Sequence, residues 1–533
     1  MTSTDRTPPV PRSAAVLEYG LPAALWLAAK QSGVFDLLFT ELSLPSNSSP
    51  SHFLLLAAFD RVCHTKKDTD IAEWYERSIL HSLWGFASED FALEEFRDCF
   101  EQISAVTNQD ILETIQSRLL GLWTDKNSVS QRLFAYDMPS FYTYIASSEE
   151  HHQHATDRNV RAASGSNIRR VGVSYVLDGE NALSLCHQLF DGNAADSEPF
   201  SAVLSRITRL LDRHQLPRER VTLVSGKSSA ALANIKELEA AGLGWISALT
   251  WDQTPEDFRR RPVDQLQSCN AADPGIFAVA ERMHLFGKEH LCVLQHSASF
   301  QAAQVEKLTI SLSRATQYLR HFARQLNNSS ARLSEERARA RIQGWLSEQY
   351  LAELVEYCLQ EKDGRLQLEF EVNGSRLQWL LDHQLGRTFL LTNRLNWSAE
   401  ELVNSFSAQE MVDTVFRGLH DGNSIGWTGP GSWSEANLRV HTFYCMLAVS
   451  LLQFMYKPVQ EIWPEVTLEL LLEELHEIKQ FVLVYSSSEE DNSERVATVL
   501  SELTPLQQAL AQVLCIDKLE TQAIAGRQLA AER

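Results

Sequence analysis

The fold is decided by short apolar segments that begin with LFAYD at residues 133–137 and continue with VGVSYVL at residues 171–177. The second segment is rich in β-branched residues, which favour strands, and the first is a short apolar run that ends in a carboxylate. Asp178 and Gly179 supply tight-turn chemistry, and residues 183–190 have the character of a hairpin partner. The sequence therefore predicts three early strands.

Beyond this hairpin, helical and β-rich stretches alternate. Residues 201–213 and the stretch that ends at residue 238 have helical character, whereas residues 221–224 and 245–249 are β-rich. Three early strands followed by such alternation are typical of an α/β fold with a mixed sheet. From residue 13 to about residue 126, apolar residues recur at three- and four-residue spacing instead, which predicts helices.

The length of 533 residues exceeds the ~250–300 at which a single core stops growing, so we expect several domains or one core with a large insertion. A long charged helix over residues 302–346, broken near Asn327, and strands at 291–294 and 366–372 interrupt the α/β plan. The predicted organisation is a disordered segment 1–12, a helical domain 13–128 for DNA binding or dimerisation, a first core part 129–251, an α+β insertion 252–385, a second core part 386–460 and a helical tail 461–533.

Composition limits the classes of function. The formal net charge is −21, from 48 Lys and Arg against 69 Asp and Glu. Because phosphate contacts come from Lys and Arg, any nucleic-acid surface has to be local. The eight Cys include no CxxC pair, which argues against zinc and favours free thiols in a reducing compartment. The most apolar stretch, residues 442–456, is shorter than the ~20 residues of a membrane span and favours a buried core helix.

Several motifs follow one another in a particular order along this plan. They are YDMPSF at 136–141, FDGNAADS at 190–197, the region 224–234, LTN at 391–393 and WSAEEL at 397–402. In this order they resemble the motifs of DDE transposases of prokaryotic insertion sequences, over roughly residues 13–520. The resemblance implies a ribonuclease-H-like mixed sheet core split by a large insertion, with an N-terminal helical domain and a C-terminal helical tail.

The resemblance also implies a chemistry. Three carboxylates, from two strands and one helix, would hold two divalent ions that activate water or a 3′-hydroxyl for in-line phosphoryl transfer. Mg²⁺ (or Mn²⁺) suits this role because it takes few protein ligands and leaves positions for phosphate oxygens and water. The first acid falls on Asp137, a catalytic and metal-binding position at a strand end; a surface Asp that closes a strand is the alternative.

The second acid falls on Gly226. VSGK at residues 224–227 stands where the family has Phe-Asp-Lys, so Lys227 occupies the position of the family's Lys. Glycine has no side chain and can ligate a metal only through its carbonyl oxygen. The resemblance therefore implies an active site that lacks at least one carboxylate.

The third acid falls on Asp413. The family's helix carries Tyr, Arg, Glu and Lys, and all four positions are changed here, to Phe406, Gln409, Asp413 and His420. Glu410 lies three residues from Asp413, so both can share one helical face, and Glu410 is a candidate substitute ligand. The alternative is that Glu410, Asp413 and Arg417 form only a solvated helix face.

Three interpretations remain open. An active transposase would need another acid in place of Gly226, and the nearest in the plan are Asp178, Asp191, Asp196 and Asp252. An inactive or domesticated copy would keep the fold and bind DNA or a protein without cleaving strands. An unrelated scaffold would lack the strand order of ribonuclease H.

The expected partner is DNA at the terminal repeats of an element, with Lys227, Arg417, Arg169 and Arg170 as contacts. The resemblance also implies a homodimer and a cytoplasmic, nucleoid-associated protein, with no membrane partner. Nucleotide binding is not expected, because Val221 stands where the pattern Gly-x4-Gly-Lys-Ser needs glycine.

Overall fold

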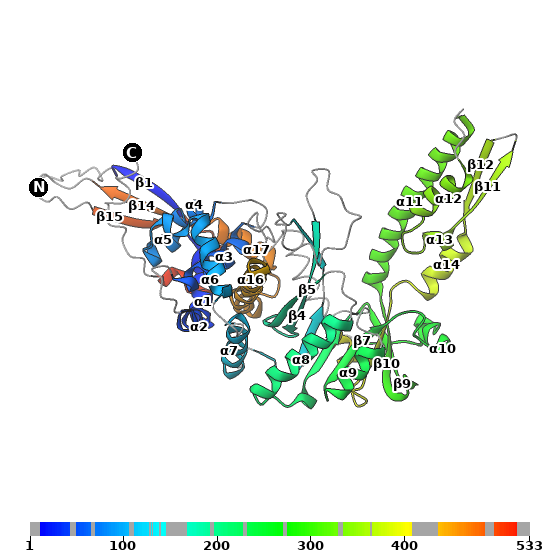
Figure 1. The fold of residues 1–533 in the computed structure, drawn as a ribbon, viewed down its shortest axis with the longest axis horizontal. Helices are drawn as coiled ribbons and strands as arrows, with labels where there is room; N and C mark the ends of the chain where they lie inside the picture. The colour runs from blue at the N-terminus through cyan, green and yellow to red at the C-terminus, as the bar shows by residue number, and fades with distance from the viewer. Residues whose placement is uncertain are drawn as a thin grey trace, which may run out of the picture. The chain divides into compact units, whose positions relative to one another are not determined.

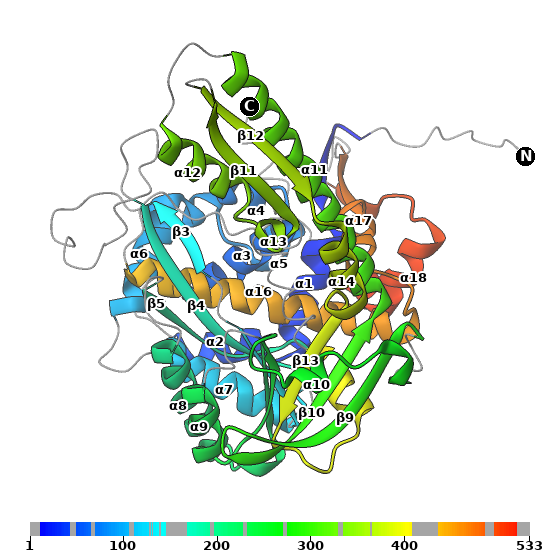
Figure 2. The ribbon, with the colours of Figure 1, turned by 90° about the vertical axis from the view of Figure 1, so that its right-hand side faces the viewer.

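The structure is a computed structural model that describes residues 11–42, 49–64, 70–105, 111–126, 129–130, 132–137, 140–144, 168–191, 197–226, 232–269, 274–328, 334–362, 365–407, 435–485 and 495–519. Figure 1 labels its helices and strands, and Figure 2 shows the same ribbon turned by 90°. The described part is a mixed α/β protein with a large mixed sheet, helices near its N-terminus and helices near its C-terminus, as the sequence predicts.

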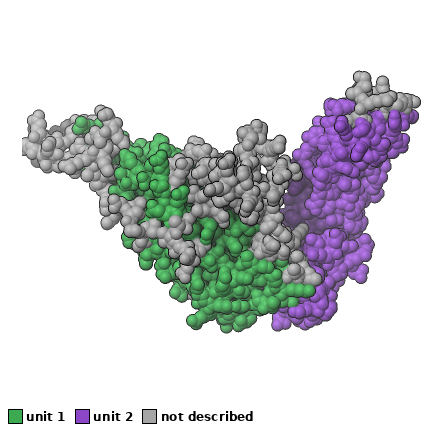
Figure 3. Space-filling view, in the orientation of Figure 1, with its two compact units in different colours: residues 1–224, 233–243, 408–533 green, residues 225–232, 244–407 purple. Residues whose placement is uncertain are grey.

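The chain divides into two compact units, which Figure 3 colours separately. Unit 1 contains Met1–Val224, Ala233–Leu243 and Ala408–Arg533. Unit 2 contains Ser225–Leu232 and Gly244–Ser407.

The N-terminal part of unit 1 is helical. Its helices are α1 (Gly20–Gln31), α2 (Val34–Glu41), α3 (Pro50–Cys63), α4 (Ile71–Glu76), α5 (Ile79–Trp84), α6 (Leu93–Ala105) and α7 (Ile111–Asp125). Local signals set their ends: Pro50 opens α3, where a missing N–H costs nothing, and the Asp70 side chain accepts from the backbone N–H groups of Ala72 and Glu73 to cap α4. Gly33, at φ 81°, allows the turn between α1 and α2.

Helix α16 (Glu435–Ile462) is the core helix of unit 1. It packs against α1, α3 and α6, and Figure 2 shows it running horizontally across the middle of the view alongside these helices. Within it, Leu438–Ile462 has the length and mean hydropathy, 1.3, of a membrane span, but 83% of its most apolar window is buried inside the protein. Burial in this core accounts for the apolar composition of the helix, in line with the predicted core helix.

The sheet of unit 1 is built on β4 (Ile168–Asp178), the longest of its strands. On one side β4 pairs antiparallel with β5 (Ser184–Asp191), through a turn at Asp178, as the sequence predicts. On the other side it pairs antiparallel with both β2 (Leu133–Asp137) and β3 (Ser140–Tyr144). Gly172 in β4 is needed by packing, since a Cβ there would lie 2.1 Å from the Phe190 ring.

A fourth strand, β6 (Thr222–Ser225), pairs with β2 on the side opposite β4. It follows α8 (Ser197–Arg213), the type of helical crossover that parallel strands need. The N–H of Thr222 donates to the carbonyl of Arg132 at 2.8 Å, so the starts of β6 and β2 lie together. Neighbouring strands that start at the same edge run parallel, and hence both also end at the same edge. Helix α9 (Leu232–Ala240) comes next.

Unit 2 contains a sheet with the order β7 (Gly244–Leu249), β13 (Arg387–Thr392), β10 (Lys288–Ser297), β9 (Ile276–Leu285) and β8 (Gln267–Ser268). The four neighbouring pairs in this order are antiparallel. The short helix α10 (Glu256–Arg259) precedes β8.

The rest of unit 2 has a hydrophobic core of its own. Its elements are α11 (Ala298–Asn328), α12 (Glu335–Trp345), α13 (Leu351–Leu354), β11 (Val355–Lys362), β12 (Arg365–Val372) and α14 (Gly374–His383). Leu319 of α11, Ile342 of α12 and Leu380 of α14 meet in this core, each fully buried. The predicted long charged helix is thus two helices, separated just after Asn328, where a break was expected.

A small three-stranded sheet in unit 1 differs from the prediction. Strand β1 (Ser13–Glu18), expected as helix, pairs antiparallel with β14 (Lys479–Tyr485), which also pairs with β15 (Arg495–Leu500). Both later strands lie in the tail that the sequence suggested was mostly helical. The tail keeps two helices, α17 (Leu468–His476) and α18 (Pro505–Val513). The reason is that β1 finds its partner more than 460 residues along the chain, which no local pattern can reveal.

Candidate functional site

Asp137 ends β2, at the edge where β6 also ends. It faces Tyr175 of β4 in the strand register, and the Tyr175 hydroxyl donates to Oδ2 of Asp137 at 3.4 Å. Asp137 is half-buried, whereas Tyr175 is fully buried. The predicted first acid therefore stands at a strand end with its carboxylate anchored to the neighbouring strand.

Gly226 is the residue that directly follows β6, and it is half-buried. Before it, the buried Ser225 hydroxyl donates to the carbonyl of Ile246 at 3.4 Å within unit 2. Along the chain, Asp137 is thus the last residue of β2 and Gly226 is the first residue after β6. Position 226 adds no side chain there.

Four of the other predicted site residues lie outside the described residues: Lys227, Glu410, Asp413 and Arg417. Arg169 and Arg170 are described in their backbone only, which pairs with Thr143 and Tyr142 in the ladder between β3 and β4.

Asp178, one candidate replacement for the missing acid, has a structural role. Its buried carboxylate accepts from the N–H of Ser130 at 3.1 Å, the Asn181 amide at 2.8 Å and the N–H of Glu180 at 3.4 Å. Burial raises its pKa to about 6. In register Asp178 faces Phe134, three residues or about 10 Å from the level of Asp137. It secures the β4–β5 turn and is too far along the sheet to share an ion with Asp137.

The remaining candidate acids are Asp191, Asp196 and Asp252. Asp191 faces Val171, four residues or about 13 Å along β4 from Tyr175. Asp252 lies in a turn after β7 of unit 2, and Asp196 is outside the described residues.

A two-metal site needs several carboxylates around ions whose bonds to oxygen are ~2.1 Å long. Among the residues that the structure describes, no group of three His, Cys, Asp or Glu side chains is arranged to hold a metal ion. Of the two described positions at the strand ends, Asp137 offers a carboxylate and Gly226 does not. These residues therefore do not fit a two-metal centre, and we derive no catalytic step through one.

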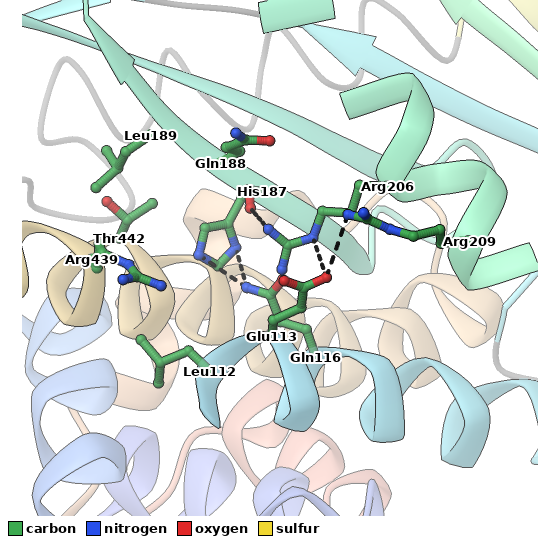
Figure 4. A pocket seen from close by; sticks show the side chains of 10 residues that line it. All are labelled: Leu112, Glu113, Gln116, His187, Gln188, Leu189, Arg206, Arg209, Arg439 and Thr442. Atoms are coloured by element: carbon green, nitrogen blue, oxygen red, sulfur yellow. Dashed lines mark hydrogen bonds and ion pairs between the residues drawn. The ribbon is translucent and has the colours of Figure 1, made fainter. Parts of the chain in front are cut away.

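A cavity of about 310 Å³ lies elsewhere in unit 1, and sequence reasoning did not anticipate it (Figure 4). Four elements far apart in the sequence form it: α7, β5, α8 and α16. Its lining consists of Leu112, Glu113, Gln116, His187, Gln188, Leu189, Arg206, Arg209, Arg439 and Thr442.

Arg206 is the centre of this cavity's hydrogen-bond network. Arg206 as a whole is only 9% exposed to solvent. Nη1 donates to the backbone carbonyl of His187 at 2.9 Å, and Nη2 donates to Oε1 of Gln116 at 2.8 Å. Two of its nitrogens are therefore held by α7 and β5, which fixes the plane of the guanidinium group.

His187 is neutral in this environment. Burial, together with the positive charges of Arg206 and Arg439, lowers its pKa from 6.5 to about 3. A neutral imidazole can accept, and Nε2 of Gln116 lies 2.7 Å from Nδ1 of His187. Gln116 thus accepts from Arg206 and donates to His187, which links the three side chains.

Charge in the lining is dominated by guanidinium groups. Arg206, Arg209 and Arg439 face a single lining carboxylate, Glu113, whose Oε1 lies 3.9 Å from both Nε of Arg206 and Nη2 of Arg209. With His187 neutral, the lining carries net positive charge. Such an arrangement favours an anion over a cation.

Part of this cavity had a signal in the sequence. Arg206 and Arg209 are three residues apart on α8, and Glu113 and Gln116 are three apart on α7, so each pair shares a helix face. The missing information was that these two faces meet beside β5. His187 has a structural role, through its hydrogen bonds with Gln116 and Arg206, in addition to lining the cavity.

The comparisons with known proteins give the following. No protein-family model matches the sequence, and no curated protein sequence matches it. A piggyBac transposase synaptic complex with hairpin DNA is similar in structure, with a TM-score of 0.36 and 9% identity, over 87% of this chain and 82% of that one. A Mos1 transposase paired-end complex with the left transposon end is similar with a TM-score of 0.16 and 15% identity, over 38% of this chain and 59% of that one. The likeness is distant, so it assigns neither an activity nor a site to this chain.

Proposed function

We propose that this protein is of transposase lineage, with a ribonuclease-H-like core, and that it has lost metal-dependent strand cleavage while still binding DNA. Support for the lineage comes from the strand order in unit 1. Across the sheet these strands lie in the order β5, β4, β2, β6. Along the chain β2, β4, β5 and β6 are the first to fourth core strands, so the spatial order is third, second, first, fourth. This is the order that the motif resemblance requires, and a core without it would have favoured an unrelated scaffold.

The loss of cleavage rests on one observation. The parallel neighbours β2 and β6 end at the same edge, with Asp137 at one end and Gly226 just after the other. In a two-metal site these two positions hold carboxylates, which bind the ions that stabilise the attacking and leaving oxygens. A glycine there removes a ligand, and Asp178 is engaged at the far end of β2.

DNA binding is proposed to use local positive surfaces, because the net charge of −21 disfavours an overall electrostatic attraction. The proposed contacts are Lys227, Arg417, Arg169 and Arg170. An insertion-sequence origin, a homodimer and a nucleoid-associated location in the cytoplasm belong to the same proposal. Mg²⁺ or Mn²⁺ would be bound only if catalysis survived.

The test uses the full chain with labelled duplexes from both flanks of its gene, in Mg²⁺ or Mn²⁺. We expect the flank duplexes to be bound more tightly than a scrambled duplex, with no cleavage of either strand. Cleavage by the natural protein that is absent in Asp137→Ala, but kept in the exposed control Asp264→Ala, would show a working nuclease. Equal or absent binding of flank and scrambled duplexes would remove the DNA-binding part of the proposal.

A further inference from the structure

We propose that the cavity formed by α7, β5, α8 and α16 is a binding site for a phosphate monoester group, which Arg206, Arg209 and Arg439 would contact. All four elements belong to unit 1, and the inference does not depend on the proposed loss of strand cleavage.

The size of the cavity suits a small ligand. Its volume of about 310 Å³ is at the lower end of the range of ligand pockets, which starts near 300 Å³. It is far too small for a DNA duplex and large enough for phosphate with part of its ester group. The Arg209 side chain is 70% exposed, so the cavity is reached from solvent on that side.

The buried guanidinium of Arg206 gives the site its chemistry. Its two terminal nitrogens are already hydrogen-bonded, to His187 and Gln116. Its Nε is buried and has no hydrogen-bond acceptor among the described residues. A buried donor without an acceptor costs free energy, which an anion in the cavity would recover by accepting from it.

Glu113 balances the charge of the arginines but does not satisfy their donors. At 3.9 Å from Nε of Arg206 and from Nη2 of Arg209, its Oε1 is beyond the 2.7–3.2 Å range of N–H···O hydrogen bonds. A phosphate group has three acceptor oxygens and about two negative charges, so it can accept from several guanidinium groups at once. Glu113 would then be a competitor that the ligand displaces.

The same residues argue for binding rather than catalysis. His187 is held neutral and hydrogen-bonded, the described lining offers no Ser, Cys or Lys, and its one hydroxyl, on the buried Thr442, donates to the backbone carbonyl of Leu438 at 2.8 Å. A divalent cation is disfavoured by the three guanidinium groups. A phosphate monoester therefore fits this lining better than a metal ion or a substrate for acyl transfer.

The phosphate could come from a small molecule or from a DNA end, and calorimetric titrations separate the two. The probes are orthophosphate, adenosine monophosphate, and a short single strand with either a 5′-phosphate or a 5′-hydroxyl. We expect saturable binding of orthophosphate by the natural protein. If adenosine monophosphate binds more tightly than the phosphorylated strand, the ligand is a small molecule. If the phosphorylated strand binds more tightly and the strand with a 5′-hydroxyl does not, the ligand is a DNA end.

Variants then test the residues. Arg209→Gln, at a side chain that is 70% exposed, should weaken orthophosphate binding by about tenfold, as expected for one lost charged hydrogen bond. Glu113→Gln should strengthen it several-fold, which a merely structural role would not do. Arg220→Gln, an exposed arginine outside the cavity, is the matched control and should leave it unchanged. Absence of saturable orthophosphate binding, or equal affinities in Arg209→Gln, Glu113→Gln and Arg220→Gln, overturns the proposal.

Discussion

Asp137 and Tyr175 face each other across the ladder between β2 and β4, and the phenol donates to the carboxylate at 3.4 Å. This contact links the expected first acid to a fully buried aromatic ring of the sheet. In the strand register Tyr175 also faces His187 on β5, so Asp137, Tyr175 and His187 lie in one row across the sheet.

Removing the hydroxyl alone should have a small effect on folding. Tyr175→Phe keeps the buried ring and is expected to lower the free energy of unfolding by about 1 kcal/mol, the net value of one hydrogen bond. Tyr175→Ala should cost about 3–5 kcal/mol, because it leaves a cavity in the sheet. Urea unfolding followed by circular dichroism measures both. Equal losses in the two variants would show that the hydroxyl, and not the ring, secures this part of the sheet.

Gly172 should not tolerate a side chain. A Cβ at this position would lie 2.1 Å from Phe190, so Gly172→Ala is expected to lower the free energy of unfolding by about 1–3 kcal/mol. Adding Phe190→Leu should restore part of that loss, which denaturant unfolding of the double variant would reveal.

The matched control is Gly344→Ala in α12, where nothing lies within 4 Å of the new Cβ. It should be neutral or stabilising by up to about 1 kcal/mol, since alanine favours a helix over glycine. A loss at position 344 as large as that at position 172 would contradict the steric explanation.

Acid should destabilise the cavity region through His187. Burial is the largest cause that lowers its pKa from 6.5 to about 3, followed by the positive charges of Arg206 and Arg439. The carboxylate in the same lining is that of Glu113 on α7. The unfolded chain therefore takes up a proton near pH 6.5 that the folded chain refuses. This contribution to stability is present above pH 6.5 and is lost as the pH falls towards 3.

The measurement compares the natural protein with His187→Gln, whose side chain does not titrate. Between pH 6.5 and pH 5 the natural protein should lose about 2 kcal/mol more than the variant, at 1.36 kcal/mol per pH unit. Other buried histidines, such as His52, contribute equally to both proteins and cancel in the difference. Parallel pH profiles would mean that His187 titrates normally in the folded state.

The strands around the site could be predicted because their signals are local. The apolar runs that became β2 and β4, and the turn at Asp178, lie within about fifty residues and carry the apolar, β-branched composition of strands and the turn chemistry of a hairpin. Strand β1 could not, because six residues with an ambiguous pattern became a strand only through pairing with β14, far along the chain. Its six-residue stretch is too short for periodicity to separate helix from strand.

The site divides in the same way. Asp137 and Gly226 could be assigned to strand ends from sequence order, and the structure places them there. The arginine cavity could not be assigned, because Gln116 and His187 are 71 residues apart and meet only when α7 packs beside β5. The spacing of charged residues along one helix predicts which of them share a face of that helix. It does not predict which other element will pack against that face.

Restoring a carboxylate at position 226 should create a metal site if the glycine is what silences the protein. In Gly226→Asp we expect a gain of Mn²⁺ binding that is lost again when Asp137→Ala is added, because the two positions end neighbouring parallel strands. Gly374→Asp, at a glycine with open space around a new Cβ, is the control and should gain no such binding.

The incomplete carboxylate set is tested most directly by counting bound Mn²⁺ in the natural protein and in Asp137→Ala, from the electron paramagnetic resonance signal of the free ion. The two proteins are predicted to bind equally little Mn²⁺ across the titration, since Asp137 has no carboxylate beside it at position 226. One or two ions bound by the natural protein and released by Asp137→Ala would contradict the account.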